Sequence, residues 1–484
     1  MANAIEGLKP ERVWKYFEEI SKIPRGSKNE AAISRFVAQT AQKLGLESST
    51  DRVGNVVVRK PASKRREGAR MVCLQGHLDM VCEKNKDKTH DFLKDPIELV
   101  RKGNIMMANG TTLGADNGVA VATNLALMSD TTAEHPPLEF LFTVDEETGL
   151  TGANSLEPGR LLSKILLNLD SEEEGALYVG CSGGRDTHGH WRADPEAAPA
   201  GYVAAELRVR GLKGGHSGLE IDKGRGNAIK ILNRALLRLA ELGGRLAHIS
   251  GGNKHNAIPR EAEALVFLPK KNLEAAAQVM AQIEGVLKAE IATVDPGLNI
   301  ALEVLPKKKA KVFKRALQKK LLQTIAALPH GVIKMSADIP GLVETSTNVA
   351  VIRTDKKAVS IVTSQRSSVA SEIDEIAEMV HTVFALGGAE IEGSDGYPGW
   401  KPNLDSEILK IAKSTFVQVF GKEPEVKAIH AGLECGIIGE RYPGMDMVSF
   451  GPTLEGVHSP DEKIYIDTVE RFWNYLLAVL KNVP

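Results

Sequence analysis

The sequence predicts an α/β domain with a mostly parallel central sheet, interrupted by a large inserted α+β domain. Short, nearly continuous apolar runs at residues 71–75, 138–144 and 165–169 are typical of strands that are buried on both faces. A helix rich in small residues is expected between the first two runs, at residues 118–128. Because strands and helices alternate here, we expect these strands to be parallel.

The first domain is expected to begin with two helices and to resume near the C-terminus. Apolar residues recur at helical spacing in residues 10–22 and 29–45, and a strand is expected at residues 56–58. Late in the chain, apolar strands and helices alternate again as they do at its start. They are a helix from about residue 404, strands at 426–431 and 446–450, and a final helix at 467–481. We therefore assign residues 1–186 and 396–484 to one domain.

Residues 187–395 differ in character and are assigned to the inserted domain. Residues 202–210 alternate between apolar and polar side chains, which is typical of a half-exposed strand. The elements expected after them are helices at 226–242, 273–292, 314–328 and 371–387, and strands at 261–268, 299–305, 347–354 and 358–366. This order suggests one or two open β/α modules, each a sheet with helices on one side. A segment rich in Gly and Pro, residues 392–403, predicts a linker back to the first domain.

Composition and charge exclude several classes of protein. The 484 residues suffice for two or three domains, and 43% hydrophobic with 25% charged residues is ordinary for a globular protein. A formal net charge of −1 argues against nucleic acid or an anionic membrane as a partner. No apolar run is long enough to span a bilayer, and no signal peptide is expected. The four cysteines are too few for a disulfide scaffold, so a cytoplasmic location is expected.

The first candidate site segment, QGHLDM, follows the expected strand at residues 71–75. Ligand sites in open α/β sheets cluster at the carboxyl ends of strands. Alternate residues of a strand share a face, so His77 could bind a metal ion while Asp79 orients it. An H-x-D triplet also arises by chance in many chains, so further ligands are needed to identify a metal site.

Three further segments place carboxylates at comparable positions. Asp116 lies in GADNG before an expected helix, where a helix N-cap is the alternative interpretation. Glu146 and Glu147 follow the strand at residues 138–144, and neighbouring side chains point differently, so one could bind metal while the other reaches a water molecule. Asp170 ends the next apolar strand, where a turn residue is the alternative.

His458 lies in a polar loop after a strand, and alone it could simply be solvated. The informative feature is the whole set of candidate ligands, which is His77, Asp116, Glu147, Asp170 and His458. Imidazole and carboxylate ligands without thiolate suit Zn²⁺, Co²⁺ or Mn²⁺. If Asp116 is shared by two ions, His77 and Asp170 complete one set of three ligands. Glu147 and His458 then complete the other set.

Glu146 is left outside this ligand set. It is therefore free to act as a general base and later as a general acid. Two neighbouring ions polarise a carbonyl group and activate a water molecule. The sequence therefore predicts hydrolysis at a carbonyl centre.

The motifs HLD, GADNG, DEETG, the LD of LNLD and VHSP, in this order, resemble those of the di-zinc dipeptidases and aminoacylases of the carnosinase type. Further segments such as GLKGGHSG, TSQRSS and HAGLECG extend the resemblance over essentially the whole chain. The resemblance implies a zinc-exopeptidase-like catalytic domain with the five ligands above, Asp116 bridging. It also implies that Asp79 orients the site, that Glu146 is the base, and that the peptide bond from Asp116 to Asn117 is cis.

The resemblance further implies that residues 187–395 form a lid over dipeptides with free ends, including those that end in histidine. Lid closure would exclude water and limit substrate length. His216, in GGHSG, would help to stabilise the tetrahedral intermediate, although such a turn could equally be structural. The expected substrate contacts are Asn256, Arg366 and Arg260 for the carboxylate and Glu434 for the free amine.

Two other functions fit the same residues. One is an aminoacylase or other amidohydrolase on the same scaffold. The other is a peptide-binding module without catalysis, against which Glu146 argues, because a binding protein needs no general base. A homodimer with paired lids is favoured over a monomer in which a duplicated lid replaces the second copy.

Overall fold

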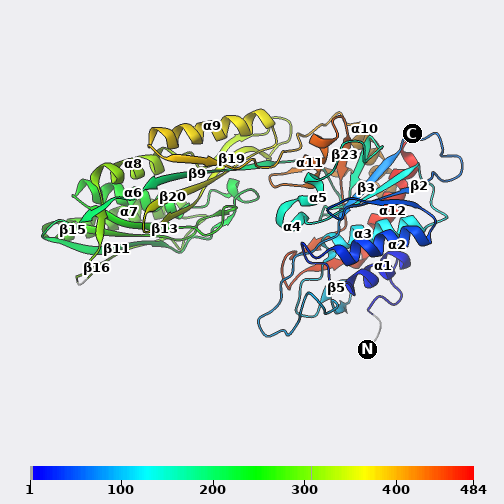
Figure 1. Ribbon diagram of the computed structural model, residues 1–484, viewed down its shortest axis with the longest axis horizontal. Coiled ribbons are helices and arrows are strands. Elements are labelled where there is room, and N and C mark those ends of the chain that lie inside the picture. The colour runs from blue at the N-terminus through cyan, green and yellow to red at the C-terminus, as the bar shows by residue number, and fades with distance from the viewer. Residues whose placement is uncertain (1–3, 307) are drawn as a thin grey trace. The chain divides into compact units, whose positions relative to one another are not determined.

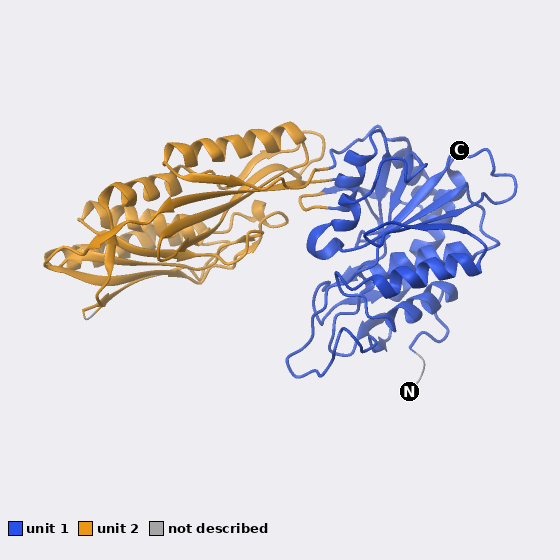
Figure 2. Ribbon diagram, viewed as in Figure 1, with its two compact units in different colours: residues 1–180, 400–428, 433–484 blue, residues 181–399, 429–432 orange. Residues whose placement is uncertain are grey.

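The structure is a computed structural model that describes residues 4–306 and 308–484. The chain forms two compact units, each with its own sheet and helices (Figures 1 and 2). Unit 1 comprises the chain up to residue 180 together with residues 400–428 and 433–484. Unit 2 comprises residues 181–399 and the short segment 429–432, whose return to this unit is not marked in the sequence.

The main sheet of unit 1 has eight strands in the order β1-β2-β6-β3-β7-β23-β8-β22. Their bounds are β1 Glu47–Thr50, β2 Val56–Lys60, β3 Val72–His77, β6 Leu138–Thr143, β7 Ile165–Asn168, β8 Ala176–Cys181, β22 Glu425–Ile429 and β23 Asp446–Ser449. The four central strands, β6, β3, β7 and β23, are parallel, whereas β2 and β8 pair antiparallel with this centre. The predicted parallel core is confirmed, and its strands β3, β6 and β7 are buried along their whole length.

The helices of unit 1 pack against this sheet and against one another. Their bounds are α1 Glu11–Ser21, α2 Ala31–Lys43, α3 Ala115–Ser129, α4 Glu146–Gly149, α5 Thr151–Asn154, α10 Glu407–Phe420, α11 Glu434–Arg441 and α12 Ile466–Asn482. Helix α3 packs between β3 and α1, and α10 packs between β23 and α12. Every residue from 117 to 128 is buried, which explains why α3 is built from small side chains. A four-stranded sheet completes the unit, with β4 Leu99–Lys102, β5 Ile105–Ala108, β24 Leu454–Glu455 and β25 Lys463–Tyr465.

Unit 2 contains one antiparallel sheet of nine strands, in the order β16-β11-β15-β13-β19-β20-β9-β21, with β18 paired to β19. Their bounds are β9 Gly183–Arg192, β11 Tyr202–Arg210, β13 Arg245–Gly251, β15 Ala262–Pro269, β16 Asn299–Leu305, β18 Gly331–Met335, β19 Val343–Thr354, β20 Ala358–Ser367 and β21 Glu390–Gly393. Of the one or two modules expected, the structure has one, because Gly251 of β13 pairs with Ile352 of β19 and joins both rounds of strands into one sheet.

Four helices cover one face of this sheet (Figure 1). They are α6 Ala228–Glu241, α7 Leu273–Ile291, α8 Arg315–Ala327 and α9 Ala370–Leu386, with short 3₁₀ turns η1 Ile221–Lys223 and η2 Lys270–Asn272. One core is shared by the helices and the sheet, with Leu232 and Phe384 of the helices and Val349 and Ile361 of the strands fully buried. The Asn227 side chain caps α6 by accepting two backbone N–H bonds.

The segment expected as a linker, residues 392–403, is partly paired rather than free. Its start belongs to β21, which pairs with β9, and Tyr397 forms a further bridge with Gly184. A Cβ atom on Gly183 would lie 2.6 Å from the backbone nitrogen of Gly399, so the two backbones approach too closely for a side chain. A segment rich in Gly and Pro shows no strand pattern, so this pairing could not be predicted from the sequence.

Two short strand pairs lie beside the large sheet of unit 2. They are β10 Pro195–Ala197 with β17 Lys311–Phe313, and β12 Gly215–His216 with β14 Ala257–Ile258. In the described part of the chain, no helix combines the length and the apolar character needed to cross a membrane.

Candidate metal centre

All five candidate ligands lie in unit 1, where the parallel strands end. His77 is the last residue of β3, Asp170 follows β7 by two residues, and Glu147 lies in α4 after β6. Asp116 is the second residue of α3, and His458 lies in the loop between β24 and β25. Because the carboxyl ends of parallel strands meet at one edge, segments far apart in the sequence converge there.

The five side chains form two groups that share Asp116. The Nε2 atom of His77 lies 3.1 Å from Oδ1 of Asp116 and 3.4 Å from Oδ1 of Asp170. The Nε2 atom of His458 lies 3.0 Å from Oδ2 of Asp116 and 3.0 Å from Oε2 of Glu147. Each oxygen of Asp116 therefore faces a different group, and the possible ligand atoms of each group lie within 4.8 Å of one another.

The chemistry of this cluster fits two divalent cations. The donors are imidazole nitrogens and carboxylate oxygens, which suit zinc, cobalt or manganese. Oε1 of Glu147 and Oδ1 of Asp170 are buried and have no hydrogen-bond partner among the described residues. Since buried polar atoms are normally satisfied, these two oxygens are consistent with ligands whose partner is an ion.

The peptide bond from Asp116 to Asn117 is cis, as expected. The Asn117 side chain donates to the carbonyl of Leu169 at 3.0 Å and accepts the N–H of His77 at 3.3 Å. A Cβ atom on Gly76 would lie 2.5 Å from the Asn117 side chain, so this position requires glycine. Asn117 thereby ties the start of α3 to the ends of β3 and β7.

Asp79 joins His77 to the turn that carries the two glutamates. One of its oxygens lies 3.3 Å from Nδ1 of His77, and the other accepts the Ser27 hydroxyl at 2.8 Å. It also accepts the backbone N–H groups of Glu146 and Glu147 at 3.0 and 3.2 Å. Burial acts to raise the pKa of Asp79, but His77 and these hydrogen bonds lower it to about 2. Asp79 is therefore a charged group beside the His77 ring, as its predicted orienting role requires.

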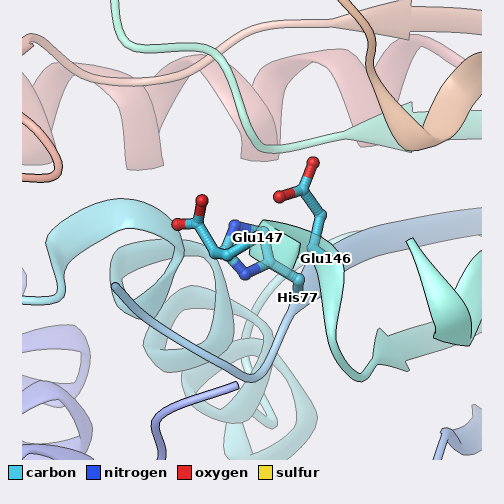
Figure 3. A group of neighbouring side chains, drawn as sticks. All are labelled: His77, Glu146 and Glu147. Atoms are coloured by element: carbon cyan, nitrogen blue, oxygen red, sulfur yellow. The ribbon is translucent and has the colours of Figure 1, made fainter. Parts of the chain in front are cut away.

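Glu146 and Glu147 direct their carboxylates differently, as Figure 3 shows beside His77. Carboxylate oxygens of both residues lie within 4.8 Å of the imidazole. Glu147 also contacts His458, whereas Glu146 has no place in the two groups that share Asp116. Desolvation raises the pKa of Glu146 well above its usual value, opposed by His77 and reinforced by neighbouring carboxylates. A carboxylate with a raised pKa suits a general base.

Glu434 is fully buried at the start of α11, in the same unit. Its Oε2 atom accepts hydrogen bonds from the buried side chains of Gln75 in β3 at 2.6 Å and Thr143 in β6 at 2.7 Å. Its Oε1 atom is buried and has no hydrogen-bond partner among the described residues. Burial raises the pKa of Glu434 to about 7. One carboxylate oxygen therefore remains available for a cationic group.

The remaining predicted site residues lie in unit 2. His216, in β12, accepts the N–H groups of Gly218 and Leu219 at its Nδ1 atom, each at 3.1 Å. Burial, then the charge of Arg366, lowers the pKa of His216 to about 4. The neutral ring therefore carries its proton on Nε2 and can donate a hydrogen bond from that atom.

The three candidates for carboxylate binding differ in their surroundings. Arg366 in β20 is 6% exposed, donates to the Tyr397 hydroxyl at 2.9 Å, and leaves its Nε atom without a partner in the described chain. Asn256 is half-buried, and its carbonyl accepts the N–H of Ser217. Arg260 is exposed at the rim of a cavity of about 440 Å³. These residues and His216 belong to unit 2 while the metal cluster belongs to unit 1, so their roles remain predictions.

Sequence reasoning missed the residues that support the loops of the cluster. Glu30 accepts the N–H of Asp145 at 2.9 Å, and Glu462 accepts four backbone N–H groups before and within α3. Arg25 donates to two carbonyl groups of the loop after β3 and to one in the turn before α3. These contacts join positions far apart in the sequence, and no periodic pattern marks them.

Three comparisons place the chain among known proteins. The model of the peptidase family M20/M25/M40 matches residues 73–482. Cytosol non-specific dipeptidase from Escherichia coli (strain K12) is 41% identical over 478 residues, which cover 99% of this chain and 98% of that protein. The crystal structure of aminoacylhistidine dipeptidase from Vibrio alginolyticus has 43% identity and a TM-score of 0.92, covering 100% of this chain and 99% of that one. Aminopeptidase PepT from Bacillus cereus shares the fold, with a TM-score of 0.63 at 18% identity over 98% of this chain and 99% of that chain.

Proposed function

The chain belongs to the peptidase family M20/M25/M40, and on this basis we propose that it is a metal-dependent dipeptidase. Its substrates are dipeptides with free amino and carboxyl ends, a broad range that includes aminoacyl-histidines. The observation that carries this proposal is the pair of ligand groups that share Asp116, beside the separate carboxylate of Glu146. The names of two relatives, more than 40% identical over nearly the whole chain, support the substrate class.

The proposal gives the ions two positions, one in each ligand group. His77 and Asp170 would hold one ion with one oxygen of Asp116, and Glu147 and His458 would hold the second with the other oxygen. When bound, such ions polarise the scissile carbonyl group and lower the pKa of water. Zinc is the metal that the ligand types favour most, with cobalt and manganese as alternatives.

Glu146 performs the proton transfers. It takes the proton of the attacking water molecule and delivers it to the nitrogen of the leaving amine. Its carboxylate is separate from that of Glu147 (Figure 3) and belongs to neither group that shares Asp116, which leaves it free for this role. Asp79 keeps the His77 ring in place and anchors the turn that carries Glu146.

Unit 2 acts as the lid. The Nε2 proton of His216 stabilises the negative charge that develops on the carbonyl oxygen. The guanidinium group of Arg366, with its free Nε atom, and the amide of Asn256 bind the substrate carboxylate, with Arg260 as a further candidate. Closure of this unit excludes water and restricts the length of the substrate.

The His216→Asn variant is expected to lower kcat about 10²- to 10³-fold, as when an oxyanion donor is removed. Metal content should stay at the wild-type value, because His216 is not among the candidate ligands. Steady-state kinetics and metal analysis measure both quantities. His381→Asn, an exposed histidine in α9, is the matched control. A wild-type kcat in His216→Asn would exclude this role.

Glu434 recognises the free amine of the substrate through its Oε1 atom, for which the described residues supply no hydrogen-bond partner. The Glu434→Gln variant should lower kcat/KM for dipeptides about 10- to 100-fold, the effect of losing one hydrogen bond between charged groups. The ratio of kcat/KM for a free to an N-acetylated dipeptide should fall with it. Glu440→Gln, exposed on the same helix, should leave both values unchanged. An unchanged ratio in Glu434→Gln would contradict amine recognition.

A substrate panel tests the function itself. Alanyl-histidine, its N-acetylated form and a tripeptide are assayed with the metal-supplemented protein. We expect rapid hydrolysis of the free dipeptide alone. Preference for the acetylated form would identify an aminoacylase, and binding without hydrolysis would identify a peptide-binding module.

We also infer a cytoplasmic location, supported by the name of the relative from Escherichia coli. A homodimer that pairs two lids is the proposed assembly. Light scattering of the purified protein measures its mass in solution, and a monomeric mass would exclude the dimer.

A further inference from the structure

Glu462 binds the turn that carries Asp116, and it is not one of the candidate ligands. Its carboxylate is 2% exposed and lies four residues after His458 in the chain. Oε2 accepts the N–H groups of Leu113 and Gly114 at 2.8 and 3.0 Å. Oε1 accepts those of Ala115 and Asp116 at 2.7 and 3.2 Å. One side chain therefore holds four consecutive backbone groups.

This contact fixes the backbone on both sides of the start of α3. Asp116 and Asn117 have non-helical backbone angles, so this turn precedes the regular part of α3. Glu462 accepts the N–H groups of the turn from a segment far away in the sequence. The loop that carries His458 is thereby connected to the backbone of Asp116.

Arg25 connects the same turn to the loop after β3. Its side chain is 3% exposed and comes from the segment between α1 and α2. Nη1 donates to the carbonyls of Leu78 and Asp79, each at 2.9 Å, and Nη2 donates to the carbonyl of Gly114. One guanidinium group thus spans the segments that follow His77 and precede Asp116.

Two glycines of the GADNG region make room for this guanidinium group. A Cβ atom on Gly114 would lie 2.6 Å from Nη2 of Arg25, and a Cβ atom on Gly118 would also lie 2.6 Å from it. Real side chains do not approach so closely. The two glycines near Asp116 therefore leave the space that the buried Arg25 side chain occupies.

Arg25 and Glu462 are both buried beside this turn. Burial lowers the pKa of Arg25, while the carboxylates of Glu462, Asp79 and Asp116 act in the opposite direction. Arg25 and Glu462 are both bonded to the turn at Gly114, Arg25 through the carbonyl group and Glu462 through the N–H group.

We propose that Arg25 and Glu462 are positioning residues that hold Asp116 and the loop after His77 in the arrangement that binds two metal ions. The inference rests on the proposed metal-dependent function. Arg25 lies before residue 73, where the match to the family model begins, so this part of the support comes from the N-terminal segment of the chain. Loss of residues that orient metal ligands typically costs 10- to 100-fold in metal affinity.

The test compares Glu462→Gln and Arg25→Lys with two exposed controls, Glu455→Gln and Arg12→Lys. Zinc affinity of the metal-free proteins is measured by competition with a chromophoric chelator, and the absorption spectrum is recorded with cobalt. Thermal unfolding of the metal-free proteins is measured in parallel. We expect zinc affinity about 10- to 100-fold lower in both variants, an altered cobalt spectrum, and wild-type values in the controls. Glu462→Asp, which keeps the charge, should recover part of the affinity.

Wild-type zinc affinity and cobalt spectrum in the folded variants would overturn the inference, even with a lowered melting temperature, because a purely structural role would affect stability alone. If Glu462→Gln does not fold, Arg25→Lys and Glu462→Asp decide by the same criteria. If the variants match a wild-type protein that binds two ions and hydrolyses dipeptides, this inference fails and the proposed function stands. A wild-type protein that binds no zinc would instead refute the proposed function.

Discussion

The Glu146→Ala variant is expected to lose nearly all turnover, with kcat reduced by at least about 10²- to 10⁴-fold, while its metal content stays unchanged. The reason is the separation of roles within the cluster. Glu147 takes part in a group that shares Asp116, whereas Glu146 does not. Removing Glu146 should therefore remove the proton carrier and leave the ligands in place. Dipeptide kinetics together with metal analysis of the same sample measure the two effects.

Glu157→Ala serves as the control, since this glutamate is exposed in the same region of unit 1. It should retain wild-type kinetics and metal content. High activity in Glu146→Ala would remove this residue from the mechanism. Loss of both ions in Glu146→Ala would show instead that the carboxylate is a ligand.

The Asp116→Ala variant is expected to lose both metal ions together with its activity. Each oxygen of this carboxylate faces a different histidine, at 3.1 Å from His77 and 3.0 Å from His458. No other residue belongs to both of these groups among the described residues. Metal analysis after dialysis against a weak chelator, with dipeptide kinetics, measures the loss. The expected fall in activity exceeds that of any substrate-contact variant, because both groups lose a ligand.

Asp461→Ala, an exposed aspartate near His458, is the matched control and should keep two ions. Asp170→Ala provides a comparison within the cluster, because Asp170 belongs to only one of the two groups that share Asp116. It should weaken one site more than the other. Retention of two tightly bound ions in Asp116→Ala would refute the bridging role.

The fold of unit 1 could be predicted because its signals are local. Strands buried on both faces need continuous apolar runs, and β3, β6 and β7 arise from such runs. The long helices were predicted to within a few residues, since their apolar spacing is regular. Short elements such as α4 and α11 carry too few residues for a periodic pattern.

The sheet of unit 2 was only partly predicted. Strand β9 was missed because Gly, Asp and His alternate in it instead of apolar residues, although it pairs along its whole length with β20. The two successive sets of strands form one sheet through a single residue pairing between β13 and β19. Such a pairing between distant segments leaves no mark in either strand alone.

The candidate metal ligands were predicted more completely than the residues that hold their loops in place. The candidate ligands lie at the ends of predicted strands or beside a predicted helix, so local motifs place four of them at one sheet edge, and their residue types suggest metal binding. Glu462 and Arg25 act on the same loops from positions that are adjacent only in the folded chain. Most arginines and glutamates of a chain are exposed, and nothing in the sequence marks the few that are buried. The sequence alone therefore does not identify Arg25 and Glu462 as supporting residues.

The most direct test of the central claim is an anomalous-scattering map from crystals of the zinc-loaded protein, recorded at the zinc absorption edge. We predict two peaks with one oxygen of Asp116 near each, at distances of about 2.0–2.2 Å. One peak should also lie beside His77 and Asp170, and the other beside Glu147 and His458. A single peak, or peaks away from Asp116, would contradict the two-ion centre on which the proposed mechanism rests.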